Sequence, residues 1–213
     1  MIDPEDPHYR GKLWGTKDLK FWAGLSLILN RMEPESILEI GAGRSTTFFA
    51  DYACSTSTNF VSIEENWEWH HKITDDLTCM CLPTNYIRHV PVKNGWYDIS
   101  IFNSEVEDRI YDLVMIDGPV GDEARGHIHA MGRLAEICSN TPLVIVDDTH
   151  RPHAKAYLET IARGREMITA SYMQRQYRYR PTQIAWVRNE ISFIVSDSHI
   201  KIIKDALRTA GVI

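Results

Sequence analysis

Apolar residues along this chain occur in short continuous runs that alternate with stripes of helical spacing. The runs at 37–40, 113–116 and 143–146 predict buried parallel strands, because both faces of such strands are covered by helices. Between 17 and 31 apolar residues recur every three or four positions, which predicts an amphipathic helix. The same reasoning predicts strands at 59–65 and 86–92 and helices at 45–52, 67–77 and 151–162. This alternation predicts an α/β fold.

The last fifty residues have a different pattern. Segments 167–173 and 182–187 predict two antiparallel strands, which the polar and aromatic segment 174–181 connects. Residues 191–195 are expected to add an edge segment before a final helix. We expect the hairpin to close over a substrate site or to form a contact between subunits of a homo-oligomer.

Composition limits the class of protein. With 213 residues and 44% hydrophobic content, residues 1–213 are expected to form one domain, over whose surface the polar segment 1–15 lies. The net charge of −6 argues against nucleic acid and anionic membrane as partners. No apolar run has the length of a membrane span, and the N-terminus lacks the basic and apolar regions of a signal peptide. We therefore expect a cytoplasmic protein.

The segment Glu39-Ile-Gly-Ala-Gly43 is the strongest candidate for ligand binding. A strand ends here, two glycines make a tight turn, and a helix-compatible segment begins near Ser45. Glycine lets a ligand approach the backbone because no Cβ intervenes, and a helix N-terminus offers free N–H groups. A dinucleotide site would require a third glycine at position 46, but this residue is Thr46. The turn is therefore a candidate site for another cofactor.

With its Glu-x-Gly-x-Gly pattern, the segment resembles the first motif of the class I S-adenosylmethionine-dependent methyltransferases. The resemblance implies a Rossmann-like, doubly wound seven-stranded sheet with a C-terminal antiparallel hairpin. It also implies that the acid and the glycines hold the amino-acid end of the cofactor. The cofactor-binding set expected on this basis is Glu39, Gly41, Ala42, Gly43, Ser45, Glu64, Trp96 and Asp117.

Two members of this set have alternatives. Glu64 ends the second predicted strand, where a carboxylate can accept hydrogen bonds from a ribose, and Glu65 is the alternative one residue later. Trp96 or Tyr97 lies where this family usually holds the adenine ring. The alternative for both aromatic residues is that they anchor a packed loop.

Three aspartates follow the two most apolar strands. Asp117 comes directly after 113–116, and Asp147 and Asp148 come after 143–146. Parallel strands end at one edge of the sheet, where ligands bind, so these carboxylates are expected to lie together. Carboxylates in such proximity repel one another unless they are protonated, hydrogen-bonded or bridged by a cation. An all-oxygen set suits Mg²⁺ or Mn²⁺.

Asp117, Asp147 and Asp148 resemble the divalent-metal site of catechol-type and macrolide-sugar O-methyltransferases. In that reading the metal holds the acceptor and lowers the pKa of its hydroxyl group. The alternative is that Asp148 or His150 acts directly as a general base. The candidate catalytic residues are therefore Asp117, Asp148 and His150.

The expected function is methyl transfer from S-adenosylmethionine to a hydroxyl of a small molecule or sugar. Segments 112–119 and 148–151 also look like those of methyltransferases that act on sugar hydroxyls. Three alternatives use a related fold: a nucleotide-binding oxidoreductase, a nucleic-acid methyltransferase, and a cofactor-binding module without catalysis. Thr46 argues against the oxidoreductase, and the negative charge argues against nucleic acid.

Overall fold

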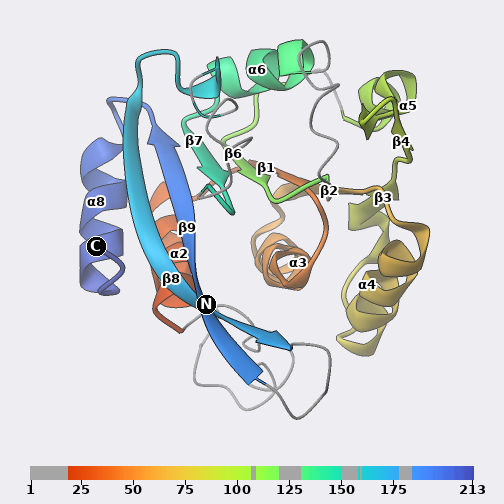
Figure 1. The fold of residues 1–213 in the computed structure, drawn as a ribbon, viewed down its shortest axis with the longest axis horizontal. Helices are drawn as coiled ribbons and strands as arrows, with labels where there is room; N and C mark the ends of the chain where they lie inside the picture. The colour runs from red at the N-terminus through yellow and green to blue at the C-terminus, as the bar shows by residue number, and fades with distance from the viewer. Residues whose placement is uncertain (1–18, 107–108, 120–130, 150–157, 159, 178–183) are drawn as a thin grey trace.

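Seven strands form one mixed sheet in the order β3-β2-β1-β6-β7-β9-β8 (Figure 1). The computed structural model describes residues 19–106, 109–119, 131–149, 158, 160–177 and 184–213. The strands of the sheet are β1 (Ser36–Ile40), β2 (Asn59–Glu64), β3 (Ile87–His89), β6 (Leu113–Ile116), β7 (Leu143–Val146), β8 (Glu166–Tyr177) and β9 (Ile184–Val195). A separate small hairpin consists of β4 (Val92–Lys93) and β5 (Trp96–Tyr97).

The strands from β3 to β7 pair in parallel, whereas β9 is antiparallel to both β7 and β8. The helices are α2 (Leu19–Met32), α3 (Arg44–Thr56), α4 (Trp67–Cys79), α5 (Ile99–Glu105), α6 (Met131–Ser139) and α8 (Ile200–Thr209), with a 3₁₀ turn η1 at Thr84–Tyr86. This architecture confirms the predicted doubly wound, seven-stranded α/β sheet with a C-terminal antiparallel hairpin.

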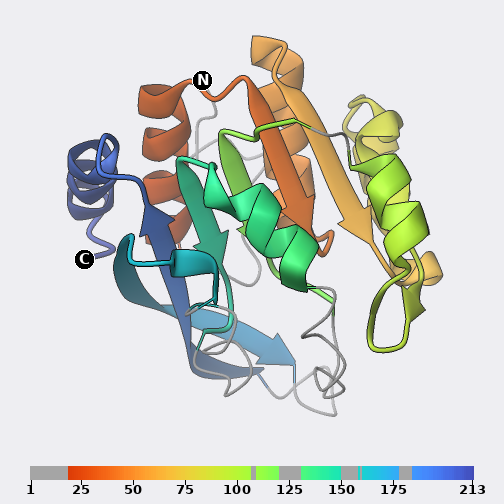
Figure 2. The ribbon, with the colours of Figure 1, turned by 90° about the horizontal axis from the view of Figure 1, so that it is seen from above.

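Alternate residues of the buried strands contribute to two cores, one on each face of the sheet (Figure 2). In β1, Ile37 belongs to the core that also contains apolar residues of α2, α3, α4 and α8. Its neighbour Leu38 belongs to the other core, together with residues of α5 and α6. The continuous apolar runs of the sequence thus follow from strands that are covered on both sides.

The C-terminal strands are longer than the sequence predicts. β8 and β9 pair in register from Glu166↔Val195 to Tyr177↔Ile184, so residues 174–177 of the expected connecting segment 174–181 belong to β8, and residues 178–181 lie outside the described part of the chain. The expectation of an edge segment at 191–195 is wrong, because these residues lie inside the sheet between β7 and β8. Val146↔Ser192 is the last pair with β7, so the rest of the hairpin extends beyond β7 as a two-stranded ribbon.

Two differences concern the region after β2. The third strand is shorter than predicted, because Val92 leaves the sheet and starts the small hairpin with an exposed side chain. The sequence analysis also missed α5, whose N-terminus is capped by Asp98 through bonds from the backbone N–H groups of Ser100 and Ile101. None of the described helices is long and apolar enough to cross a membrane.

The carboxyl ends of β1, β2, β6 and β7 meet at one edge of the sheet. The backbone N–H of Asp117 donates to the carbonyl of Ile40 at 2.8 Å, and that of Asp147 donates to Ile116 at 2.9 Å. These bonds hold the residues that follow β1, β6 and β7 beside one another. This edge is where the predicted site residues are found.

Candidate cofactor-binding site

The glycine turn after β1 packs against the backbone that follows β6. Gly41 has φ +91°, and a Cβ on it would lie 2.6 Å from the nitrogen of Gly118. A Cβ on Gly118 would likewise lie 2.7 Å from the Cα of Gly41. Both positions therefore require glycine, and the reason at Gly41 is the close approach of two protein backbones as well as its positive φ.

The polar groups of the turn are bonded within the protein. The Ala42 N–H donates to Oε2 of Glu64 at 3.0 Å, and the Gly43 N–H donates to Oγ1 of Thr46 at 2.8 Å. The Ala42 carbonyl accepts a 2.7 Å bond from the indole Nε1 of Trp69 on α4. The turn is thus held rigidly from three directions. It does not present the two N–H groups that a bound phosphate would need.

Glu39 contributes to the position of the turn through Thr46. Its Oε2 accepts 2.6 Å bonds from Thr46 Oγ1 and from Ser62 Oγ, and the Glu39 side chain is fully buried. Ser45 is also buried, and neither Glu39 nor Ser45 lines the cleft beside the turn. The sequence analysis expected both residues among those that bind the cofactor. In the structure Glu39 connects β1, β2 and α3.

A cleft of about 750 Å³ opens beside the turn. It is bounded by the glycine turn, the end of β2, the first turns of α4, the β4 hairpin and the end of β6. Its lining residues are Gly41, Ala42, Glu64, Glu65, Asn66, Glu68, Trp69, Lys72, Val92 and Asp117. The predicted residues Gly41, Ala42, Glu64 and Asp117 therefore meet in one cavity, whose lining holds four carboxylates and one ammonium group.

Glu64 is the most constrained carboxylate of the cleft. Its side chain is only 3% exposed, and its Oε1 accepts a second backbone bond, from Asn66 N–H at 2.7 Å. Burial raises the pKa of Glu64 to about 7, against the effect of the bonds from Asn66 and Ala42. The neighbouring carboxylates of Glu65 and Glu39 raise this pKa further. Because this pKa lies near neutral pH, a group that binds Glu64 can change its protonation and therefore the charge of the cleft.

Glu65, the alternative to Glu64, also lies in the cleft. Its Oε2 accepts a 3.2 Å bond from the hydroxyl of Tyr97. Trp96 and Tyr97 are 3% and 1% exposed and pack with Phe102 of α5. Neither residue lines the cleft. Their burial fits the interpretation as packed loop anchors, and the indole of Trp96 has no exposed face for an adenine ring.

The aromatic residue that does line the cleft is Trp69, which the sequence analysis did not single out. Its indole separates the cleft from a smaller hollow of about 200 Å³ that Gly43 and Arg44 help to form. Nζ of Lys72 lies 4.0 Å from the ring centroid of Trp69. Trp69 and Lys72 are three residues apart on a helix that starts at the edge of the sheet where ligands bind. This spacing was the feature of the sequence that could have pointed to both residues.

The three aspartates do not form the expected metal site. Among the residues that the structure describes, no group of three or more His, Cys, Asp or Glu side chains is arranged to hold a metal ion. Asp117 faces the cleft, whereas Asp147 is 6% exposed and its Oδ1 accepts the backbone N–H of Asp148 at 2.8 Å. Asp147 is thus used to shape the turn after β7. His150 lies outside the described residues.

Comparisons with known proteins bear on the fold. No protein-family model and no curated protein match the chain. A solved structure of a candidate O-methyltransferase from Klebsiella pneumoniae is 15% identical with a TM-score of 0.54, over 92% of this chain and 93% of that one. The precorrin 8W decarboxylase of Methanobacterium thermoautotrophicum is 13% identical with a TM-score of 0.51, over 80% and 88%. The methyltransferase domain of METTL16 is 14% identical with a TM-score of 0.51, over 84% and 67%.

At these identities the likeness concerns the fold alone. The chain has the class I methyltransferase fold, as expected from the Glu-x-Gly-x-Gly segment.

The two glycines of the turn are expected to differ in their effect on stability. Gly41→Ala combines a positive φ with a backbone clash and should lower the free energy of unfolding by roughly 2–4 kcal/mol. Gly43→Ala is the matched control, because a Cβ there meets no atom within 4 Å, and it should cost no more than about 1 kcal/mol as a change of helix N-cap. Urea unfolding of both variants measures the difference, and equal losses would refute the distinct role of Gly41.

Glu64 should make stability pH-dependent. Its pKa is raised from 4.5 to about 7, so between these values the folded protein keeps a proton that the unfolded chain releases. The free energy of unfolding therefore falls as pH rises through this window, by up to roughly 3 kcal/mol at about 1.4 kcal/mol per unit. The Glu64→Gln variant has no titrating carboxyl group at this position, so its free energy of unfolding should not fall in this way.

Urea unfolding at pH 5 and pH 8 should show the stability of Glu64→Gln improving relative to the wild type at the higher pH. A constant difference between the two proteins would contradict the assignment.

Proposed function

We propose that the chain binds S-adenosylmethionine in the cleft beside the glycine turn and transfers its methyl group to a hydroxyl of a small molecule. The observation that carries this proposal is the combination of an acidic cleft with a turn whose N–H groups are already bonded. Glu64 and Thr46 occupy the N–H groups of Ala42 and Gly43. The remaining polar lining consists mainly of carboxylates.

This chemistry disfavours a phosphate-bearing cofactor. A pyrophosphate would lie beside Glu64, Glu65 and Asp117 without the backbone donors that usually neutralise it. S-adenosylmethionine has no phosphate, and its sulfonium and ammonium groups outweigh its carboxylate by one positive charge. The cleft therefore fits this cofactor better than NAD or ATP. A polyanionic nucleic acid is disfavoured for the same reason, in line with the net charge of −6.

The residues have separable tasks in such a complex. The carboxylate of Glu64 can accept hydrogen bonds from the ribose hydroxyls, and Trp69 offers an apolar face with Lys72 behind it. Asp117 brings a negative charge to the end of β6, next to the turn after β7. A bound sulfonium supplies an activated methyl group, so the protein has to align the acceptor and accept its proton.

For the proton we propose Asp148 as the general base. It lies at the carboxyl end of β7, in a left-handed conformation with φ +54°, directly after the carboxylate of Asp147 that accepts its N–H. Asp148 is not among the residues that line the cleft, but this turn holds it at the same edge of the sheet, whereas Asp147 is bonded within the turn itself. The proposal uses no divalent metal.

Calorimetric titration is the first test of the proposal. S-adenosylmethionine and S-adenosylhomocysteine should bind at micromolar concentration, and NAD should not bind. Addition of Mg²⁺ should leave the affinities unchanged. Binding of NAD, or the absence of binding by both sulfur compounds, would overturn the proposal.

The charge of the cleft gives a sharper test. Asp117→Asn removes one carboxylate from the lining, which should weaken S-adenosylmethionine binding by about five-fold while changing the affinity for the neutral S-adenosylhomocysteine much less. Glu105→Gln, which removes a carboxylate outside the cleft, is the control. If Asp117→Asn weakens both ligands equally, electrostatic selection of the cationic cofactor is wrong.

A further inference from the structure

The smaller hollow beside Trp69 has a lining that differs from that of the cofactor cleft. It lies between the N-terminus of α3 and helix α4, and its volume is about 200 Å³. We name it the α3–α4 hollow, and its lining includes Gly43, Arg44, Trp69, Lys72, Ile73 and Asp76. This volume is below the range of sites that hold drug-sized ligands, so the hollow suits a single small group.

Arg44, the first residue of α3, brings an unpaired guanidinium group to the hollow. Its Nη1 is buried and donates no hydrogen bond. Among the residues that the structure describes, Arg44 also takes part in no ion pair. A buried charged donor without an acceptor costs free energy. An oxyanion in the hollow would remove this cost, because the fork of N–H groups on a guanidinium matches two oxygens of such a group.

Lys72 supplies a second positive charge, from α4. Its Nζ lies over the Trp69 ring, and within the described part of the chain no carboxylate pairs with it. Asp76, one turn later on α4, also lines the hollow but forms no ion pair with Lys72 or Arg44. The lining therefore holds two unpaired positive charges and one negative charge.

The N-terminus of α3 adds to this positive potential. Gly43 is the N-cap of the 13-residue helix, so the positive end of the helix dipole lies at the hollow. The N–H of Gly43 itself is bonded to Thr46, so a ligand would depend on the side chains of Arg44 and Lys72. In contrast, the cofactor cleft is lined by four carboxylates and one ammonium group.

We propose that the α3–α4 hollow binds a free, doubly charged oxyanion of the size of phosphate, and that this anion strengthens the binding of S-adenosylmethionine in the neighbouring cleft. Two cations favour a double over a single negative charge, and the small volume disfavours a nucleotide.

The second part rests on the proposed function. Lys72 lines both cavities and is the one positively charged residue in the lining of the cleft. An anion that pairs with Lys72 offsets this charge, so the cleft becomes more negative for its ligand. The cationic S-adenosylmethionine gains from this change, whereas the neutral S-adenosylhomocysteine gains much less.

Phosphorus-31 NMR titration of the full chain with inorganic phosphate at pH 8 tests the first part. Phosphate should bind, and acetate should displace it only at concentrations at least five-fold higher. Arg44→Gln and Lys72→Gln should each weaken phosphate binding at least five-fold. Asp76→Asn should strengthen it by about three-fold, an effect that a general loss of structure would not produce.

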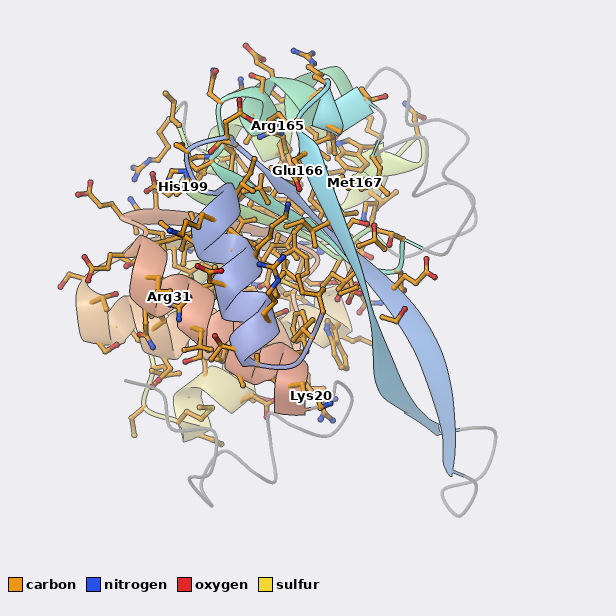
Figure 3. The ribbon with its side chains drawn as sticks, turned by 90° about the vertical axis from the view of Figure 1, so that its left-hand side faces the viewer. Lys20, Arg31, Arg165, Glu166, Met167 and His199 are labelled. Atoms are coloured by element: carbon orange, nitrogen blue, oxygen red, sulfur yellow. The ribbon has the colours of Figure 1, made fainter. Side chains whose placement is uncertain are left out.

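Arg31→Gln and Lys20→Gln are the matched controls, because they remove the same charges from α2, where Figure 3 shows both side chains beside α8. Both residues are exposed, and neither lines the hollow. The controls should bind phosphate as the wild type does, and urea unfolding shows which variants are folded. If folded Arg44→Gln and Lys72→Gln bind phosphate normally, or if the controls weaken it equally, the anion site is wrong.

Calorimetric titration with and without phosphate tests the second part. Saturating phosphate should tighten S-adenosylmethionine binding by about three-fold and leave S-adenosylhomocysteine nearly unchanged, and the cofactor should tighten phosphate binding by the same factor. Lys72→Gln should abolish this coupling. Competition between phosphate and S-adenosylmethionine would make the hollow part of the cofactor site and overturn the proposal. If phosphate binds but neither sulfur compound does, the anion site stands and the proposed function fails.

Discussion

The close approach of Gly41 to Gly118 is the constraint on which the ligand edge depends. Two backbone segments come so near that a Cβ on either residue would lie under 3 Å from the other backbone. This approach places the end of β6, with Asp117, beside the turn after β1. The bonds that the turn donates to Glu64 and Thr46, and the bond that it accepts from Trp69, then fix the turn in one orientation. The walls of the cleft at the turn are therefore held in place by contacts within the protein.

That rigidity changes the role usually given to such a glycine turn. In a dinucleotide site the turn is valuable for its free N–H groups, but here Thr46 accepts from Gly43 and donates to the buried Glu39. Thr46 stands at the position where a dinucleotide site has its third glycine. Its hydroxyl group makes both of these bonds, which a glycine could not make. In the sequence, Thr46 at this position argues against a dinucleotide site. In the structure, the Thr46 hydroxyl accepts the N–H of Gly43, so this N–H is not available to a phosphate.

The sequence predicted what depends on local pattern. Apolar runs identified the buried strands, and the residues directly after them, Gly41, Glu64 and Asp117, meet in the cleft because parallel strands share one carboxyl edge. Side chains that act between elements were not predictable in this way. Trp69 reaches the Ala42 carbonyl from another helix, and Trp96 is buried because α5 packs against it. Spacing along the chain does not encode either contact.

The lengths of β8 and β9 illustrate the same limit. Alternation is weak at 174–177, and strand there is imposed by pairing with the residues from Ile184 to Val187. Only the inner part of this hairpin is supported by β7, since Val146↔Ser192 is the last shared pair. Glu190 lies just beyond that pair, and its carbonyl bond to Thr149 ties the base of the ribbon to the end of β7. A movement at the base of the ribbon would therefore also move the turn that carries Asp148.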